Sequence, residues 1–255
     1  MLPYFQWLSF HLGPVTIQVW GLMVALGFIV GYYFCRYRVK QKSLSASHLD
    51  NLVVLIIFFS LLVGRLAHVF LYEPRIFVRD PWEIIKIWDG GMSVFGGFIG
   101  ALIAAILYLR IKRLDLWFYF DALIFGLPFG YAIGRLGCFF NFDHPGTPTS
   151  FFLGQQYLDV VRHNHGLYLS LTGLVMAGIF WGWRKKKLPR HFLTALFAVW
   201  YGIVRFTLDF WRAYDLPQAD ARYFGLTPAQ YGSILLVLIG VWLLVSKNKA
   251  RRLSA

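Results

Sequence analysis

Long, almost uninterrupted apolar runs recur along this chain and limit how it can fold. An α-helix needs about 20 apolar residues to cross a bilayer, and several runs have roughly that length. They cover about 15–35, 52–72, 92–110, 118–134, 167–183, 192–211 and 227–246. Only 15% of the residues are charged, whereas soluble domains carry about 25%. We therefore predict an all-α membrane protein with about seven transmembrane helices.

The distribution of positive charge predicts the orientation of these helices. A net charge of +13 is compatible with nucleic-acid binding, but most Lys and Arg residues gather in alternate loops. They are Arg36, Arg38, Lys40, Lys42, Arg110, Lys112, Arg113, Arg184, Lys185, Lys186, Lys187, Arg190, Lys247, Lys249, Arg251 and Arg252. Because basic loops stay in the cytoplasm, the N-terminus is predicted outside and the C-terminus in the cytoplasm. We read the charge as a topology signal and expect no nucleic-acid partner.

The segments outside the apolar runs suggest a single membrane domain, 1–255, with two small appendages. Residues 1–14 contain no Lys or Arg, so they lack the basic region of a cleavable signal peptide and are expected to form an interfacial arm rich in aromatic residues. Residues 135–166 are too polar to span a membrane and too short for an independent domain. We expect them to form a small extracytoplasmic cap.

The cysteine and histidine spacing does not indicate a metal centre. Cys35 and Cys138 are predicted to lie near opposite faces of the membrane, so a disulfide between them is not expected, and neither CxxC nor HExxH is present. His163 and His165 in VRHNHG are an alternative metal pair, but no further ligands accompany them in the sequence. We predict no metal and no cofactor.

Two arginines, Arg65 and Arg205, lie inside apolar runs. Each arginine costs about 2.5–3.5 kcal/mol at the centre of a bilayer, so neither is expected to face lipid. One interpretation is a structural ion pair with Asp121 or Asp209, because Asp209 follows Arg205 by four residues on one helix face.

A second interpretation adds Arg135 and Arg212, which lie toward the outer ends of their spans. Guanidinium groups bind phosphate oxygens in bidentate fashion, and phospholipid head groups are the anions available at that depth. On this interpretation the residues predict an outward-facing, arginine-lined pocket for an anionic lipid.

Four segments occur in a fixed order along the chain: GRLAHVFLY (64–72), IWDGGMSVFGGFIG (87–100), GRLGCFFNFDHPG (134–146) and YGIVRFTLDFWR (201–212). Together with PAQYGSILL (228–236), they resemble the signature motifs of the bacterial prolipoprotein diacylglyceryl transferase family. The resemblance implies a multi-pass transferase of the bacterial inner membrane that uses phosphatidylglycerol. Its implied acceptor is the lipobox cysteine of a lipoprotein precursor, and glycerol 1-phosphate is the implied leaving group.

The resemblance also implies roles for individual residues. Arg135 and Arg205 match the family's two essential arginines, and they are expected to hold the phosphate as it gains negative charge. Asp143, which stands for a Glu of the family, and His68, a candidate because of its position near Arg65, complete the predicted catalytic set. The residues expected to contact substrate are Arg65, Phe95, Gly96, Gly97, Cys138, Asn141, Gly146, Tyr201, Asp209 and Arg212.

Several positions depart from the family's pattern. Phe95 stands where the family usually has His before its paired glycines, and Cys138 stands for the Asn of GRxGN. Asp143 and Asp209 stand where the family has Glu. By contrast, Asn141 matches the residue that the family has at this position.

The substitution by Phe95 removes the obvious base for the acceptor thiol, which must become a thiolate before it attacks carbon. His68, three residues after Arg65 on the same helix face, and His144 in the cap are candidate replacements. Cys138 is either a covalent nucleophile or a packed small residue.

The alternatives to the family's reaction are a divergent paralogue that moves a lipid moiety to another acceptor and a non-catalytic protein that binds anionic lipid. A transporter is disfavoured, because the chain shows neither paired repeats nor matched broken helices.

Overall fold

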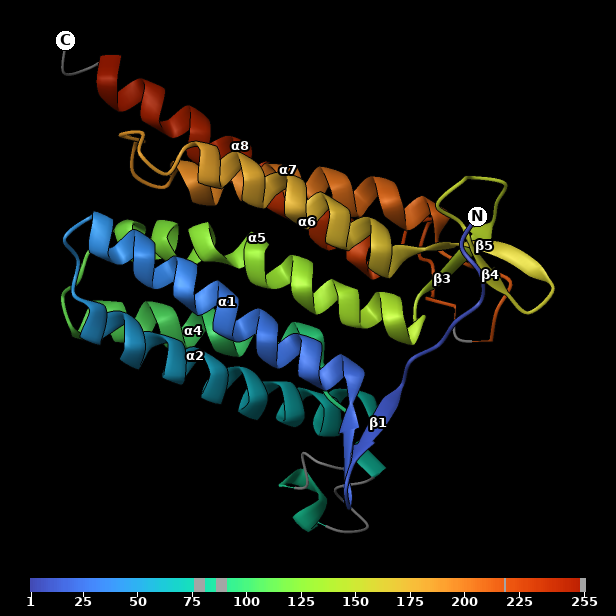
Figure 1. Ribbon diagram of the computed structural model, residues 1–255. Helices are drawn as coiled ribbons and strands as arrows, with labels where there is room; N and C mark the ends of the chain where they lie inside the picture. Colours follow the sequence, from blue (N-terminus) through green and yellow to red (C-terminus); the bar gives the residue numbers. More distant parts are fainter. Residues whose placement is uncertain (76–80, 86–90, 218, 253–255) are drawn as a thin grey trace. The chain divides into compact units, whose positions relative to one another are not determined.

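The computed structural model describes residues 1–75, 81–85, 91–217 and 219–252 (Figure 1). The long helices are α1 (Val19–Gln41), α2 (Ala46–Ala67), α4 (Val94–Ile111), α5 (Leu116–Asn141), α6 (His165–Gly182), α7 (Phe192–Leu208) and α8 (Pro228–Arg252). A π-helix, η1 (His68–Tyr72), and two 3₁₀ helices, η2 (Pro81–Ile84) and η4 (Asp209–Trp211), are short. The strands are β1 (Ser9–Leu12), β2 (Val15–Gln18), β3 (Pro145–Pro148), β4 (Gln155–Tyr157) and β5 (Val160–Asn164).

Within these described residues, 7 helices are long and apolar enough to cross a membrane, which confirms the predicted all-α multi-pass class. The first helix begins at Val19 rather than near residue 15, because 9–18 form the antiparallel hairpin of β1 and β2. The fourth helix continues to Asn141 rather than ending near residue 134, since no proline interrupts its last three turns. As a result Arg135 and Cys138, expected in the cap, lie on α5.

The chain divides into two compact units. Unit 1 comprises Met1–Arg38 and Phe120–Ala255, and unit 2 comprises Val39–Tyr119. In unit 2, α2 and α4 pack directly against each other. A Cβ atom at Gly96 of α4 would lie only 2.4 Å from the Cβ of Ala67, so the small residues let the two backbones approach closely.

The core of unit 1 forms between α5, α6 and α7. Phe125, Met176, Phe180 and Leu193 are at most 1% exposed and make up its centre. The outer face of α8 stays apolar, with Leu238 and Trp242 exposed. This distribution suits a bundle whose surroundings are lipid tails, which are as apolar as the side chains themselves.

A small three-stranded antiparallel sheet, in the order β3–β5–β4, lies beside the end of α5 and the start of α6 (Figure 1). Leu2 forms a parallel bridge with Gln155 of β4, and the Trp7 amide donates to the Phe140 carbonyl at 2.8 Å. Part of the predicted interfacial arm therefore joins this cap. Strand β5 leads directly into α6, whose first turn is capped by the side chain of Asn164.

Candidate active site

Arg135 lies near the end of α5, where its helix positions two partners for it. The guanidinium carbon lies 5.3 Å from the ring centroid of Tyr131, one turn earlier. Its Nη1 donates toward the Sγ of Cys138, three residues later, at 3.7 Å. The ring of Tyr201 on α7 packs edge-on against Tyr131 with centroids 5.7 Å apart. Among the described residues Arg135 forms no ion pair with a carboxylate, so its charge is available to a bound anion.

Arg205 is held by a carboxylate with no solvent exposure, that of Asp209. The two residues are four apart, so they share a helix face at the junction of α7 and η4. The hydroxyl of Thr227 donates to the other Asp209 oxygen. The Nε of Arg212 lies 3.9 Å from Asp209 and 2.9 Å from Asp220. The structure thus confirms the ion pair between Arg205 and Asp209 that the spacing indicated.

Three arginines converge although they come from α5, α7 and the segment after η4. Arg135, Arg205 and Arg212 are all near enough to the imidazole of His144 for their positive charges to act on it. Tyr131 lies within electrostatic range of both Arg135 and Arg205. Several fixed guanidinium groups around one point form an arrangement that can bind a phosphate.

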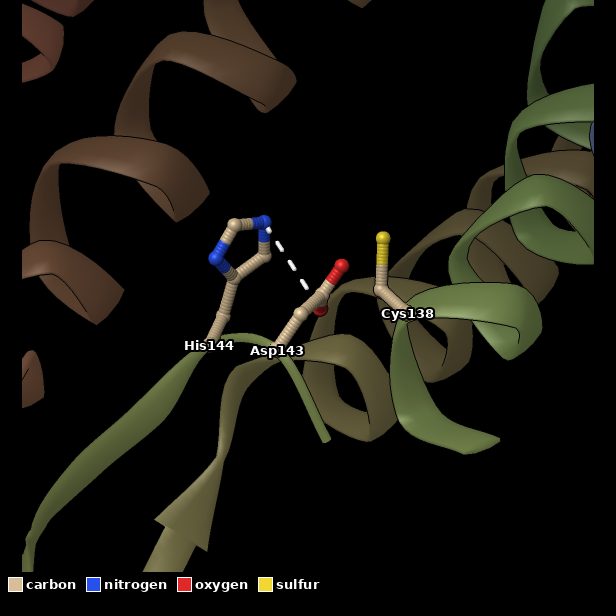
Figure 2. A group of neighbouring side chains, drawn as sticks. All are labelled: Cys138, Asp143 and His144. Atoms are coloured by element: carbon tan, nitrogen blue, oxygen red, sulfur yellow. Dashed lines mark ion pairs between the residues drawn. The ribbon is translucent and has the colours of Figure 1, made fainter. Parts of the chain in front are cut away.

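Cys138, Asp143 and His144 lie together (Figure 2), and each is within electrostatic range of Arg135. Phe142, directly after the last residue of α5, has a left-handed backbone with φ of 48°, a conformation that commonly ends a helix. It turns the chain so that the next two side chains face the thiol of Cys138. The Nε2 of His144 lies 3.8 Å from Oδ1 of Asp143.

Burial and the arginines set the ionisation of this pair. The pKa of His144 falls to about 3, first because the half-buried ring is desolvated and then because the three arginines repel a further positive charge. The pKa of Asp143 is raised by burial, which outweighs the opposing effects of a backbone hydrogen bond, Arg135 and Arg212. His144 is therefore a neutral imidazole at neutral pH.

Gly146 explains how the segment after η4 can approach the cap. A Cβ atom there would lie 2.5 Å from the Trp211 carbonyl oxygen and 2.7 Å from the Cβ of His163. Gly146 also forms an antiparallel bridge with Arg212. The glycine thereby lets Arg212 lie beside strand β3, close to His144.

Asn141 and the alternative metal pair lie around the same end of α5. The Oδ1 of Asn141 is buried and has no hydrogen-bond partner among the described residues. His163 bonds through Nδ1 to the Tyr168 hydroxyl at 2.8 Å and stacks on Trp211. His165 is only 2% exposed. His163 thus serves in the packing of the cap.

The remaining predicted site residues belong to unit 2. Arg65 is buried and donates through Nη1 to the Gly91 carbonyl at 3.0 Å. His68 stacks on Tyr72, and its Nε2 lies 3.6 Å from a Glu73 carboxylate oxygen. Phe95 is exposed.

Gly96 and Gly97 of the same unit lie at the interface of α4 with α2. A Cβ atom at Gly97 would lie 3.0 Å from the Ser60 hydroxyl oxygen. Within unit 2 both glycines have a packing role, because they allow the two helices to approach.

Sequence reasoning missed Tyr131, Thr227 and Gln230. Thr227 and Gln230 exchange hydrogen bonds of 3.0 and 3.2 Å between side chain and backbone, which is a capping box at the start of α8. The pattern T-x-x-Q was a signal for this box, and the one-turn spacing of Tyr131 from Arg135 was a signal for their contact. The contact of Thr227 with Asp209 had no local signal.

These features define a multi-pass membrane protein in which partly buried arginines from separate segments lie near a common point at one end of a bundle. The family model described as prolipoprotein diacylglyceryl transferase matches residues 8–246. The chain therefore belongs to the prolipoprotein diacylglyceryl transferase family, as its motifs indicated.

Similar proteins match nearly the whole chain. One, from Wolbachia pipientis subsp. Culex pipiens (strain wPip), is 32% identical over 241 residues, which are 91% of this chain and 91% of the relative. Another, from Dechloromonas aromatica (strain RCB), is 32% identical over 264 residues and covers 98% of both chains. A third, from Acinetobacter baumannii (strain SDF), is 31% identical over 249 residues, 92% of this chain and 90% of the relative. All three are named phosphatidylglycerol–prolipoprotein diacylglyceryl transferase.

Proposed function

We propose that this protein transfers the diacylglyceryl group of phosphatidylglycerol to the lipobox cysteine of a lipoprotein precursor and releases glycerol 1-phosphate. The observation that carries the proposal is the convergence of Arg135, Arg205 and Arg212 around His144. Family membership and the names of the relatives support the donor and the acceptor. The proposed place of action is the bacterial inner membrane, with the cap on the extracytoplasmic side.

The proposed reaction places negative charge where the arginines lie. The acceptor thiolate attacks a glyceryl carbon, a carbon–sulfur bond forms, and the carbon–oxygen bond to phosphate breaks. The phosphate oxygen keeps the electron pair, so the leaving group becomes more negative. Arg135 and Arg205 are the proposed phosphate ligands, and removing one fixed donor of this kind typically lowers kcat by about 10²–10³-fold.

The test uses the purified full-length protein in nanodiscs that contain phosphatidylglycerol, together with a lipobox peptide. We expect release of glycerol phosphate and a peptide whose mass increases by the diacylglyceryl group. Arg135→Gln and Arg205→Gln should each abolish most of this transfer. Arg184→Gln is the matched control, because this arginine lies in the loop after α6 and stacks on Trp181.

Other outcomes would replace the proposal with one of its alternatives. Release of glycerol phosphate without modification of the peptide would indicate a different acceptor. Phosphatidylglycerol that copurifies without turnover, and whose binding weakens in Arg135→Gln, would indicate a lipid-binding protein. Equal transfer by Arg135→Gln and the unchanged protein would contradict the phosphate role.

Phe95→His tests whether this chain has a damaged or a rebuilt site. We expect the variant to transfer less, because the chain also departs from the family's pattern at Cys138 and Asp143, as a rebuilt site would. A gain in transfer would instead show that Phe95 impairs the reaction. Arg65, Gly96 and Gly97 remain proposed substrate contacts.

A further inference from the structure

We infer that Cys138, Asp143 and His144 form a binding site for a single zinc-like divalent cation. Each residue offers one ligand atom, and the three atoms lie within 4.8 Å of one another (Figure 2). Thiolate sulfur, imidazole nitrogen and carboxylate oxygen are the ligand types of protein-bound zinc. The sequence had no standard metal motif, so this grouping differs from the expectation of no metal.

The distances are close to those of an occupied site. Zinc bonds of about 2.0–2.2 Å to nitrogen or oxygen and about 2.3 Å to sulfur separate tetrahedral ligand atoms by roughly 3.3–3.7 Å. The His144 and Asp143 atoms are already 3.8 Å apart, which is too long for a hydrogen bond between them. No two of the three ligand atoms are more than 4.8 Å apart. A pair at that limit would have to move roughly 1 Å closer to reach the separation found around bound zinc.

The fold makes this site closed on one side and open on the other. Cys138 is only 6% exposed on α5, whereas the side chains of Asp143 and His144 are each 35% exposed. Three protein ligands leave a fourth position of a tetrahedral ion free, as in catalytic rather than structural zinc sites. A further ligand can reach the site from the side of the exposed pair.

The charges around the site are compatible with a dication once the thiol is ionised. A Cys138 thiolate and the Asp143 carboxylate supply two negative charges, which balance the ion. The Nη1 of Arg135 donates toward the sulfur at 3.7 Å, and a bound cation would itself deprotonate the thiol. Arg205 and Arg212 add positive charge around His144, so the site needs both anionic ligands to retain the metal.

A role for this metal rests on the proposed function. The acceptor thiol would occupy the open position and lose its proton to solvent, because a thiol that binds zinc is deprotonated. Its sulfur then forms the bond to the glyceryl carbon, and the phosphate oxygen leaves with the electron pair of the broken bond. Cys138, Asp143 and His144 thereby hold the nucleophile, and the arginines hold the leaving group.

The experiment measures metal binding by the purified full-length protein after treatment with a chelator and reloading with Zn²⁺ or Co²⁺. We expect about one metal ion per chain and a thiolate-to-cobalt charge-transfer band in the near ultraviolet. Cys138→Ser should lose the band and bind Zn²⁺ more than about 100-fold more weakly. Changing a residue that only hydrogen-bonds to a metal ligand typically weakens binding by about 10–100-fold, so this loss would be larger. Cys35→Ser is the control, because Cys35 is a second buried free thiol of unit 1 and should leave the site intact.

Two results would overturn the inference: no retained metal in the reloaded protein, or equal binding by Cys138→Ser and the unchanged protein. His144→Gln should weaken binding as well, and thermal unfolding of each variant separates loss of the site from loss of the fold. Metal binding without diacylglyceryl transfer would support the site and contradict the proposed function. Full transfer by the chelated protein would contradict the metal's role.

Discussion

At the scale of single residues, Asp209 organises the arginines. Its side chain has no solvent exposure, pairs with Arg205, accepts from the Thr227 hydroxyl and lies 3.9 Å from Arg212. A buried carboxylate with these partners keeps two guanidinium groups oriented. Its removal would leave the charge of Arg205 buried and uncompensated.

Asp209→Ala should lower the free energy of unfolding by roughly 3–5 kcal/mol, the usual effect of breaking a buried ion pair from one side. Asp220→Ala is the matched control, because Asp220 pairs with Arg212 at 2.9 Å but its side chain is 38% exposed. Such a pair contributes about 1 kcal/mol or less. Unfolding of both variants in the same bilayer-like detergent gives the comparison, and equal losses would contradict the central role of Asp209.

His68 is one of the two candidate bases in the sequence, beside His144, and within unit 2 it pairs with Glu73. If it accepts the thiol proton, His68→Gln should lower kcat by about 10²–10⁴-fold, the contribution of general bases, with little change in lipid binding. His11→Gln is the control, since His11 is exposed in the β1–β2 hairpin. Unchanged turnover would exclude His68 as a base.

At the scale of secondary structure, glycines set the distance between α1 and α5. A Cβ atom at Gly130 would lie 2.4 Å from the Gly27 carbonyl oxygen, and one at Gly126 would lie 2.3 Å from the Gly31 carbonyl oxygen. Both contacts are with backbone, which cannot rotate away as a side chain can. The position of α5, and with it that of Arg135, therefore depends on residues without side chains.

Gly130→Val should destabilise the protein by roughly 1–3 kcal/mol, as overpacking typically does, and should lower transfer by displacing Arg135. Gly178→Val on α6 is the control, because a Cβ atom there meets nothing within 4 Å. That change should stay within about 0.5 kcal/mol. Thermal unfolding measures both, and a tolerated Gly130→Val would contradict the close helix contact.

The segment after η4 is attached to the cap by the ion pair of Asp215 with Arg162, whose nitrogens donate to the carboxylate at 3.0 and 2.5 Å. These hydrogen bonds lower the pKa of Asp215 below that of a free carboxyl group. The pair is thus fully formed at neutral pH, and its contribution is lost as the pH falls through the lowered folded-state pKa.

Once the pH falls below the folded-state pKa of Asp215, we expect the backbone amides of 213–216 to exchange hydrogen faster relative to their intrinsic rates. Asp215→Asn should show the faster relative exchange already at neutral pH and no acid transition. Hydrogen exchange followed by mass spectrometry measures both proteins. An acid transition that persists in Asp215→Asn would assign the effect to another group.

At the scale of the whole molecule, unit 1 carries the arginines and the cap, and unit 2 carries Arg65 and His68. Within unit 1, α5 and α7 end, and α6 and α8 begin, near the same end of the bundle (Figure 1). The basic loop of Arg184–Lys187 follows the other end of α6. The predicted topology places these two ends on opposite sides of the membrane.

Cysteine labelling tests that orientation. Ser150→Cys in the cap should react with a membrane-impermeant maleimide on intact cells, whereas Lys186→Cys should react only after permeabilisation. Both positions are exposed, and the two native cysteines are buried. The unchanged protein gives the background, and the reverse pattern would contradict an external cap.

The number of helices and the pairing of Arg205 with Asp209 could be predicted because they depend on neighbouring residues. Apolar length decides whether a helix can span a membrane, and a spacing of four places two side chains on one helix face. The extension of α5 to Asn141 was not predicted. The approach of Gly146 to Trp211 could not be read from the chain either, because it depends on packing between distant segments.

The amino-acid order alone was sufficient for the class of protein, its spanning segments and its family motifs, since these follow from local hydropathy, charge and residue identity. Tertiary packing decided that Arg135, Arg205 and Arg212 come within electrostatic range of His144, and that Cys138 lies near Asp143 and His144. Their side chains come together only where α5 and α7 pack, where Phe142 reverses the chain and where Gly146 leaves room. Such contacts depend on the relative rotation and separation of helices, which no short stretch of sequence specifies.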